Sequence, residues 1–403
     1  MIRRLLACLV VASLSCSAAA RAEAPPRSIA IGEALDLAAM GATQPRIATA
    51  RVDAARTEIG VAGIFPNPRV ALGTTTATAI LTGSVVFFLP VFGQVGVARD
   101  AGRALVATRE ASLGAVKLDA RLAAALAWID LWLAEHESAI ARDEATRSER
   151  VATVARARED EGSSPHLDVL RAEADAARAL AEADALAIGV RAQEARLALA
   201  LGADAQTEHY VTRGPPLGET DVPPAGNDAA AVDRHPLVRT ADAAVREADA
   251  AAAQAGRARF PVLALQAGGN FLRRQAPEND VQFGIALDIP LFDGPLVTRA
   301  DSQRALAAVA ADGARVDATG RLAAARAEAL AAIGRARATV EKVLPAAEQA
   351  AALSIEAYEH GALDLTAVLA AEQTLAQTRL SAVRTEAVRG RALARLRWAA
   401  GLP

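Results

Sequence analysis

The sequence predicts a mainly α fold with a smaller membrane β part, built from two halves that follow one plan. Very long alanine-rich helical patterns occur in both halves, and two short alternating segments precede each of them. Proline and glycine anchors recur in the same order in each half. A repeat of this kind is typical of a duplicated unit, so we expect residues 23–203 and 228–403 to be equivalent structural repeats.

Residues 1–22 have the features of a signal peptide. Two arginines precede an apolar run, and the small-residue pattern of a cleavage site ends at Ala22. Cys16 follows small residues, so lipidation at this cysteine is an open alternative. The other cysteine, Cys8, also lies in this segment, so the exported chain is expected to contain no disulfide and no cysteine-ligated metal.

Composition narrows the class of protein. Charged residues make up 23% of the chain with a net charge of −3, and both signs alternate along the helical patterns, so nucleic-acid binding is not expected. The best apolar run after the leader, residues 79–92, is shorter than the ~20 residues that a membrane helix needs and ends around Pro90. If this protein spans a membrane, it does not use helices.

Each repeat is expected to begin with a helix, over residues 32–63 and 228–259. Both helices should break near a proline, Pro45 and Pro236, because a residue that precedes proline avoids the α region.

Much longer helices are expected over residues 96–160 and 296–359, with a kink at Pro345. At ~1.5 Å per residue such a helix is about 100 Å long, which no compact domain requires. After a turn, each long helix is followed by a returning helix. The segment 204–227 is rich in proline and glycine and is expected to be an irregular linker between the repeats.

Two β-hairpins are expected, at about residues 67–90 and 261–290. The segment 281–289 alternates completely between apolar and polar or small residues, and 262–271 does the same. Nine or ten residues suffice for a tilted strand to cross a bilayer. The side chains expected to face lipid are Leu263, Leu265, Phe271, Val281, Phe283, Ile285 and Leu287.

Four strands cannot close a barrel, and lipid does not tolerate open sheet edges. Membrane insertion would therefore require several chains to share one barrel. The alternative is a soluble periplasmic or secreted helical-hairpin protein with a structural or adaptor-like role, which the low aromatic content of 3% would suit.

In the order and spacing of its motifs the chain resembles the TolC-like outer-membrane efflux proteins, or outer membrane factors. The resemblance covers essentially all of the mature chain, and it rests on the duplicated order, the FPNP turn at 65–68, the Pro-Leu-Phe exit at 290–292 and the similar stretches 161–173 and 360–372. It implies a homotrimer with a twelve-stranded barrel in the outer membrane and a periplasmic α-barrel tunnel. The FPNP turn is more similar to the CzcC-type cation-efflux branch.

The resemblance implies a passive exit duct of a tripartite efflux or type I secretion system. Its implied partners are further copies of the chain, a periplasmic adaptor (membrane fusion) protein, an inner-membrane pump such as an RND or ABC transporter, and outer-membrane lipid. The sequence contains no P-loop, G-x-S-x-G or H-E-x-x-H motif, so we expect no enzymatic activity, no cofactor and no metal site. The substrate class, whether metal ions, drugs or peptides, stays open.

The stretches 161–173 and 360–372 lie where each long helix must reverse, and we call them the two tips. Gly162 and Gly361 suit the positive φ that ends a helix, and Asp364 suits the start of the returning one. The resemblance implies that the tips face the adaptor through Arg158, Gly162, Ser163, Ser164, Pro165, Gly361, Ala362, Leu363, Asp364 and Leu365.

The resemblance also implies a gate latch between Asp168 and Tyr358. A carboxylate that accepts a hydrogen bond from a phenol contributes about 1–3 kcal/mol, so a docking partner could break it. The simpler alternative leaves Asp168 solvated and Tyr358 packed between helices. His166 and His360 flank the tips, but two imidazoles without a carboxylate or cysteine partner make a poor metal site.

Overall fold

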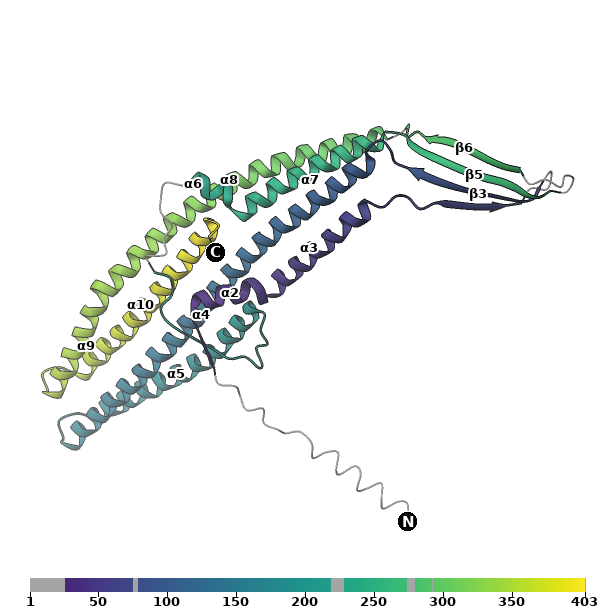
Figure 1. The fold of residues 1–403 in the computed structure, drawn as a ribbon. Coiled ribbons are helices and arrows are strands. Elements are labelled where there is room, and N and C mark those ends of the chain that lie inside the picture. The colour runs from purple at the N-terminus through teal and green to yellow at the C-terminus, as the bar shows by residue number, and fades with distance from the viewer. Residues whose placement is uncertain (1–25, 75–78, 219–227, 274–279, 292, 403) are drawn as a thin grey trace, which may run out of the picture.

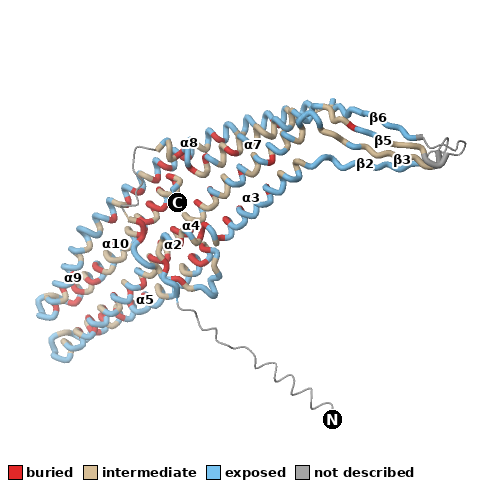
Figure 2. The backbone as a smooth tube through the Cα atoms, in the orientation of Figure 1, coloured by how far each residue is buried: buried red, intermediate tan, exposed pale blue. Residues whose placement is uncertain are grey.

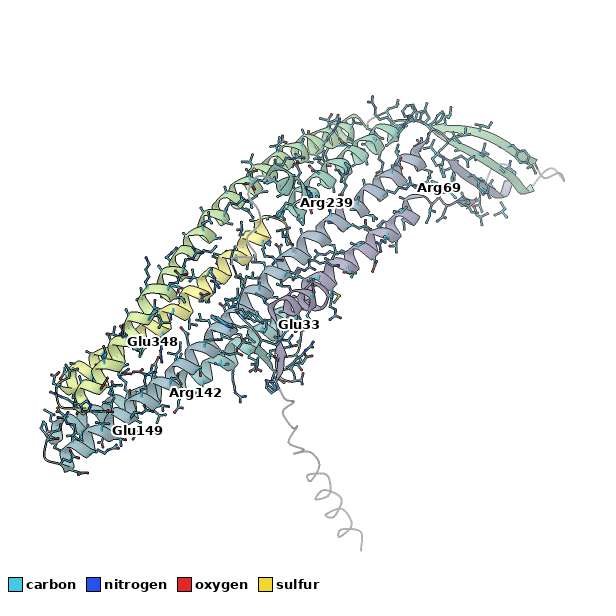
Figure 3. The ribbon with its side chains drawn as sticks, turned by 60° about the vertical axis from the view of Figure 1, so that its left-hand side comes forward. Glu33, Arg69, Arg142, Glu149, Arg239 and Glu348 are labelled. Atoms are coloured by element: carbon cyan, nitrogen blue, oxygen red, sulfur yellow. The ribbon has the colours of Figure 1, made fainter. Side chains whose placement is uncertain are left out.

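The computed structural model describes residues 26–74, 79–218, 228–273, 280–291 and 293–402. They form a long curved molecule, with a four-stranded sheet at one end and two helical tips at the other (Figure 1). Arg69 lies at the sheet end and Glu149 near the tips, with Glu33 between them (Figure 3). The predicted mainly α fold with a smaller β part is confirmed. The predicted signal peptide, residues 1–22, lies outside the described residues.

The elements follow the same order in both halves. The first half contains α2 (Ile31–Gly41), α3 (Thr43–Ala62), β2 (Arg69–Gly73), β3 (Ala79–Leu89), α4 (Gln94–Asp160) and α5 (His166–Leu201). The second half contains α6 (Asp228–Arg234), α7 (Pro236–Ala258), β5 (Val262–Arg273), β6 (Asp280–Asp288), α8 (Gly294–Ala338), the π-helical turn η3 (Thr339–Val343), α9 (Leu344–Glu359) and α10 (Leu365–Ala399).

The first helix of each half is broken near its proline, as predicted. In the second half His235 is extended and Pro236 begins α7. In the first half the break is at Ala42, with a ψ of 148°, and Pro45 lies in the first turn of α3. Proline is tolerated in a first turn because the N–H groups there have no intrahelical acceptor.

The two long helices differ in continuity. Helix α4 runs without interruption for 67 residues, which corresponds to about 100 Å. The second is interrupted by η3, directly before α9, whose second residue is Pro345. Proline has no N–H to donate to the carbonyl four residues earlier, so the interruption expected at Pro345 is present as a π-helical turn.

The main apolar core lies midway along the molecule, around the fully buried Trp128 of α4. Its indole N–H donates a hydrogen bond of 2.9 Å to the Ile29 carbonyl oxygen. Ile29 ends β1 (Arg27–Ile29), which pairs in parallel with β4 (Tyr210–Thr212). The segment 204–227 was predicted to be irregular, but its described part contains the short strand β4.

Burial decreases toward the sheet. Buried residues follow the facing sides of the helices, whereas most of the sheet is exposed or half-buried (Figure 2). The strand order is β2-β3-β5-β6, and all neighbours are antiparallel. The first hairpin was predicted at about residues 67–90, and its second strand, β3, begins at Ala79 and pairs with β5 from that residue on.

Within the described ranges, no helix combines the length and apolar character that a membrane crossing requires.

Candidate functional site

One face of the sheet is apolar. Phe87 of β3 pairs with Leu265 of β5, and Leu265 pairs with Ile285 of β6, so the three side chains form a row across the strands. Phe283 belongs to the next row on this face and is 84% exposed. An apolar face left this open in a single chain requires a non-aqueous neighbour.

The register places six of the predicted lipid-facing side chains on that face. They are Leu263, Leu265, Val281, Phe283, Ile285 and Leu287. The side chain of the seventh, Phe271, lies outside the described part of the structure.

The other face carries polar and small residues and a hollow toward the loop end of the sheet, with Val86 and Phe88 nearer the helices. Ser84, Gly268 and Gln282 form one of its rows. Together with Gln266 and Asn270 they line a hollow of about 390 Å³. The sheet therefore presents one apolar surface and one surface suited to water.

The two tips have the same backbone geometry. Gly162 and Gly361 have φ angles of 71° and 72°, which confirms the positive φ predicted for both. The Gly162 N–H donates to the Glu159 carbonyl oxygen at 2.8 Å, and the Gly361 N–H donates to that of Tyr358 at 3.0 Å. Each long helix thus ends in a glycine with left-handed backbone angles, whose N–H donates a hydrogen bond to a carbonyl oxygen of the last helical turn.

The returning helices start differently. Asp364 accepts a hydrogen bond of 3.2 Å from the Ala367 N–H, so the predicted N-cap of α10 is confirmed. Helix α5 starts after Pro165, and the Ser164 hydroxyl donates to the Asp168 carboxylate at 3.1 Å. Asp168 therefore already has a local partner.

The predicted hydrogen bond between Asp168 and Tyr358 is not formed. Tyr358 is 4% exposed, and its hydroxyl has no hydrogen-bond partner among the described residues. The guanidinium of Arg158 lies 4.5 Å from the centroid of the Tyr358 ring and donates to the Tyr358 carbonyl oxygen at 2.7 Å. Arg158 therefore joins the first tip to the second where Asp168 was expected to do so.

Most predicted tip residues are exposed or half-buried, but Leu365 is not. It is 3% exposed and packs with Val151, Tyr358 and Val368 in an apolar cluster between the tips. Its side chain therefore does not reach the surface of the chain. Sequence reasoning missed Leu167, which is 54% exposed at the start of α5.

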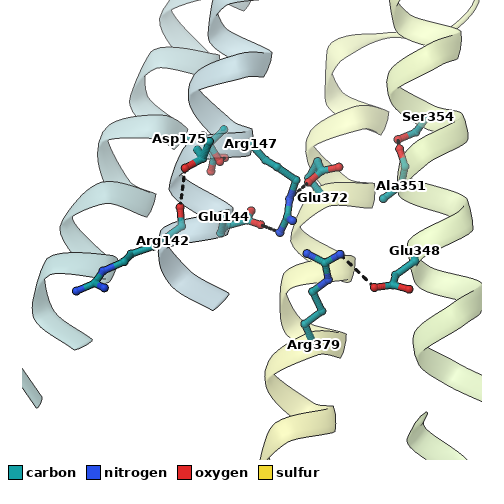
Figure 4. A network of polar contacts seen from close by, with 11 residues as sticks. Arg142, Glu144, Arg147, Asp175, Glu348, Ala351, Ser354, Glu372 and Arg379 are labelled. Carbon is teal, nitrogen blue, oxygen red and sulfur yellow. Dashed lines mark hydrogen bonds and ion pairs between the residues drawn. The ribbon is translucent and has the colours of Figure 1, made fainter. Parts of the chain in front are cut away.

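A buried polar cluster lies behind the tips, and sequence reasoning also missed it. Arg147 of α4 donates from Nε to Glu372 of α10 and from Nη2 to Glu144 of α4, both at 2.9 Å (Figure 4). Both carboxylates are buried. Burial raises the pKa of Glu372, and the positive charge of Arg147 partly offsets this effect. Burial opposes the charge of Arg147, but its bonds to Glu144 and Glu372 raise its pKa overall.

The tip histidine His166 pairs within its own helical hairpin. A ring nitrogen of His166 lies 2.8 Å from the carboxylate of Glu159. The described residues contain no group of three or more histidine, cysteine, aspartate or glutamate side chains that could hold a metal ion.

The family comparison covers the second half of the chain. Residues 229–402 match the family model described as outer membrane efflux protein. Over these residues the chain is similar to the outer membrane efflux protein family. A comparison with curated protein sequences found no match.

Solved structures extend the similarity to the first half. Crystal structures of CusC give a TM-score of 0.77 at 19% identity, covering 93% of this chain and 92% of that one. The outer membrane protein VceC from Vibrio cholerae gives 0.72 at 19% identity, with 92% and 96% covered. The open state of the MtrE outer membrane channel from Neisseria gonorrhoeae gives 0.73 at 19% identity, with 92% and 89% covered. The chain therefore has the fold of outer membrane efflux proteins over nearly its whole length.

Proposed function

We propose that three copies of the chain form an exit duct through the outer membrane. The observation that carries this proposal is the two-faced sheet with open edges. Within the described residues, β2 and β6 pair on one side only, and an unpaired strand edge is unstable in lipid. Pairing β6 of one copy with β2 of the next would close twelve strands into one barrel, apolar outside and polar inside.

The helical part would be the periplasmic tunnel of the duct. Helix α4 alone spans about 100 Å, enough to hold the tips far from the membrane. A water-filled duct lowers the barrier for a polar solute without a chemical step, so we assign no catalysis to the chain. An inner-membrane pump would supply the energy through a periplasmic adaptor, in a tripartite efflux or type I secretion system.

The exposed tip residues are proposed to contact the adaptor. Gly162, Ser163 and Pro165 of the first tip and Gly361 and Ala362 of the second are exposed. The tips would surround the periplasmic opening of the tunnel, which we call the mouth. The contact between Arg158 and Tyr358 is proposed to restrain the tips when the mouth is closed. The comparisons support a duct rather than a soluble structural protein, since VceC and MtrE are described as an outer membrane protein and an outer membrane channel.

Electron microscopy and conductance of the detergent-extracted protein test the proposal. We expect threefold symmetric particles with a barrel and a tunnel, and discrete conductance steps in planar lipid bilayers. A chain that stays monomeric and soluble without detergent, and that never conducts, would contradict the proposal.

A further inference from the structure

Helices α4 and α10 are joined by ion pairs at several levels. Arg384 of α10 lies 2.6 Å from Glu137 of α4, and further from the tips Arg391 of α10 lies 2.6 Å from Asp130 of α4. The pair nearest the tips reverses this polarity, because its arginine, Arg147, belongs to α4. The helices run in opposite directions, so these pairs follow one seam between the two helical hairpins, α4–α5 and α9–α10 (Figure 1).

The pair nearest the tips is also the most enclosed of the three. The side chains of Arg147 and Glu372 are 20% and 5% exposed, whereas Arg384 is 60% exposed. Arg147 also neutralises Glu144, whose side chain is 10% exposed. One guanidinium therefore bonds to two buried carboxylates, one on each side of the seam, whereas Arg379 acts on Glu372 and Arg178 on Glu144 only through their charge.

The duplicated tip stretches provide an internal comparison. Glu173 and Glu372 stand at the same distance from their tip glycines. Glu173 of α5 pairs with Arg156 of α4 at 2.7 Å, but this pair is about 40% exposed and lies within one hairpin. The equivalent glutamate of the second repeat, Glu372, crosses the seam instead. The seam contact is therefore specific to one of the two stretches.

We infer that Arg147 is a clasp that holds the two hairpins of each chain together at the closed mouth, by neutralising Glu144 and Glu372 across the seam. This inference rests on the proposed function, since a mouth must exist for the clasp to close it. The turn η3 lies between α8 and α9, on the side of the clasp away from the tip, so it gives α9 a point at which to bend, whereas α10 is continuous and would have to bend as a whole.

The physical reason is the cost of an uncompensated buried charge. With Arg147 absent, two buried carboxylates would lose the only hydrogen-bonded positive charge that they share, and they would repel each other. The closed arrangement would then be disfavoured, and parting α4 from α10 would hydrate both groups. The same change at Arg156 would leave its glutamate exposed to water, at little cost.

Conductance of purified trimers in planar bilayers tests the clasp. We expect Arg147→Gln to raise the time-averaged conductance at least about tenfold over wild type, since breaking a buried pair is costly. The matched control, Arg156→Gln, should stay within about twofold of wild type. The triple variant E144Q/R147Q/E372Q should return to the wild-type value, because it removes the charges together and leaves similar shapes.

Two results would overturn the clasp: wild-type conductance for Arg147→Gln, or no return in the triple variant, which would mean that Arg147 acts through packing alone. Should Arg147→Gln fail to assemble, Arg147→Lys replaces it. A lysine ammonium keeps the positive charge but does not have the planar donor groups by which a guanidinium binds two glutamates at once. Conductance should therefore rise by a smaller factor than in Arg147→Gln. An unchanged conductance would contradict the clasp.

Spin-label distances separate this inference from the proposed function. Labels at Ser163→Cys and Ala362→Cys, one residue after each tip glycine, report the separation of the tips without requiring conduction. Labelled chains are diluted among unlabelled copies, so that distances within one chain dominate. Longer distances in the Arg147→Gln background would support the clasp even if no protein conducts. An absence of conduction would overturn only the proposed duct. Distances equal to wild type would overturn the clasp.

Discussion

At the scale of single residues, the tips depend on a backbone conformation that only glycine adopts without strain. Gly162 and Gly361 both have φ near +70°, and each ends a long helix. No atom lies within 4 Å of where a Cβ at Gly162 would be, so a side chain there would be strained by its backbone and not by a clash. The conformation itself is therefore the constraint.

Alanine at either tip glycine should reduce stability. We expect Gly162→Ala and Gly361→Ala each to lower the free energy of unfolding by about 1–2 kcal/mol, the cost of placing a Cβ in the left-handed region. Gly313 in α8 is the matched control, because it is helical and has open space around its Cβ position. Its alanine variant should gain up to about 1 kcal/mol. Thermal unfolding measures all three, and equal effects at tip and control would contradict the argument.

Tyr358 and Arg158 distinguish two kinds of restraint at the mouth. If Asp168 and Tyr358 form the latch, Tyr358→Phe should raise conductance. The Tyr358 hydroxyl has no hydrogen-bond partner in the described parts of the chain, so we expect Tyr358→Phe to behave as wild type. Arg158→Gln removes a charged hydrogen bond between the tips, worth about 1.5–3 kcal/mol, and should increase conductance. If Tyr358→Phe raises the conductance in planar bilayers and Arg158→Gln does not, the latch between Asp168 and Tyr358 would be supported instead.

At the scale of elements, the seam between α4 and α10 responds to pH through Glu372. Burial raises the pKa of this carboxyl above its usual value, so its ionisation disfavours the folded state. Its contribution to stability is therefore greatest below the pKa of the unfolded chain and declines as pH rises through the folded pKa.

Glu372→Gln should remove that decline. The stability of the variant relative to wild type is expected to increase as pH rises from 4 through the raised pKa of Glu372. Unfolding midpoints measured at several pH values test this, with Glu173→Gln as the control because Glu173 lies in an exposed pair. A constant difference between Glu372→Gln and wild type across that range would show that burial does not control the ionisation of Glu372.

Local sequence patterns predicted those elements in which apolar residues recur with a clear period or in which a proline marks the boundary of a helix. The complete alternation of 281–289 fixed the faces of β6, and Pro236 fixed the start of α7. Three-residue β1 and β4 have no readable period, so they were missed. The clasp was missed because Arg147 and Glu372 have the appearance of solvated helix charges, and only the register between distant helices pairs them. The same register decides that Arg158, and not Asp168, reaches Tyr358.

At the scale of the whole molecule, the single chain is incomplete at its sheet. Its two edge strands, β2 and β6, are paired on one side only within the described residues. The apolar face of the same sheet is open. Water would tolerate the edges but not the apolar face, and lipid would tolerate the face but not the edges. Joining identical copies edge to edge satisfies both requirements.

Cysteine cross-linking between copies tests this closure. Val70 of β2 and the apolar-face residues of β6 should lie on the same outer surface where two copies meet. We expect Val70→Cys, combined in turn with cysteine at Val281, Phe283, Ile285 or Leu287, to give covalent dimers and trimers at one register. Oxidation of membranes followed by non-reducing electrophoresis measures the products.

Strand β3 provides the control, because it pairs with β2 and β5 of its own chain. Cysteine at Phe87 in place of Val70 should give no products between copies, since a central strand has no free edge to offer a neighbour. Single cysteines should likewise remain monomeric. The result that would contradict the shared barrel is the reverse pattern: no cross-link between β2 and β6 for any cysteine pair, together with cross-links between copies through Phe87→Cys. The strands of neighbouring copies would then meet in another geometry.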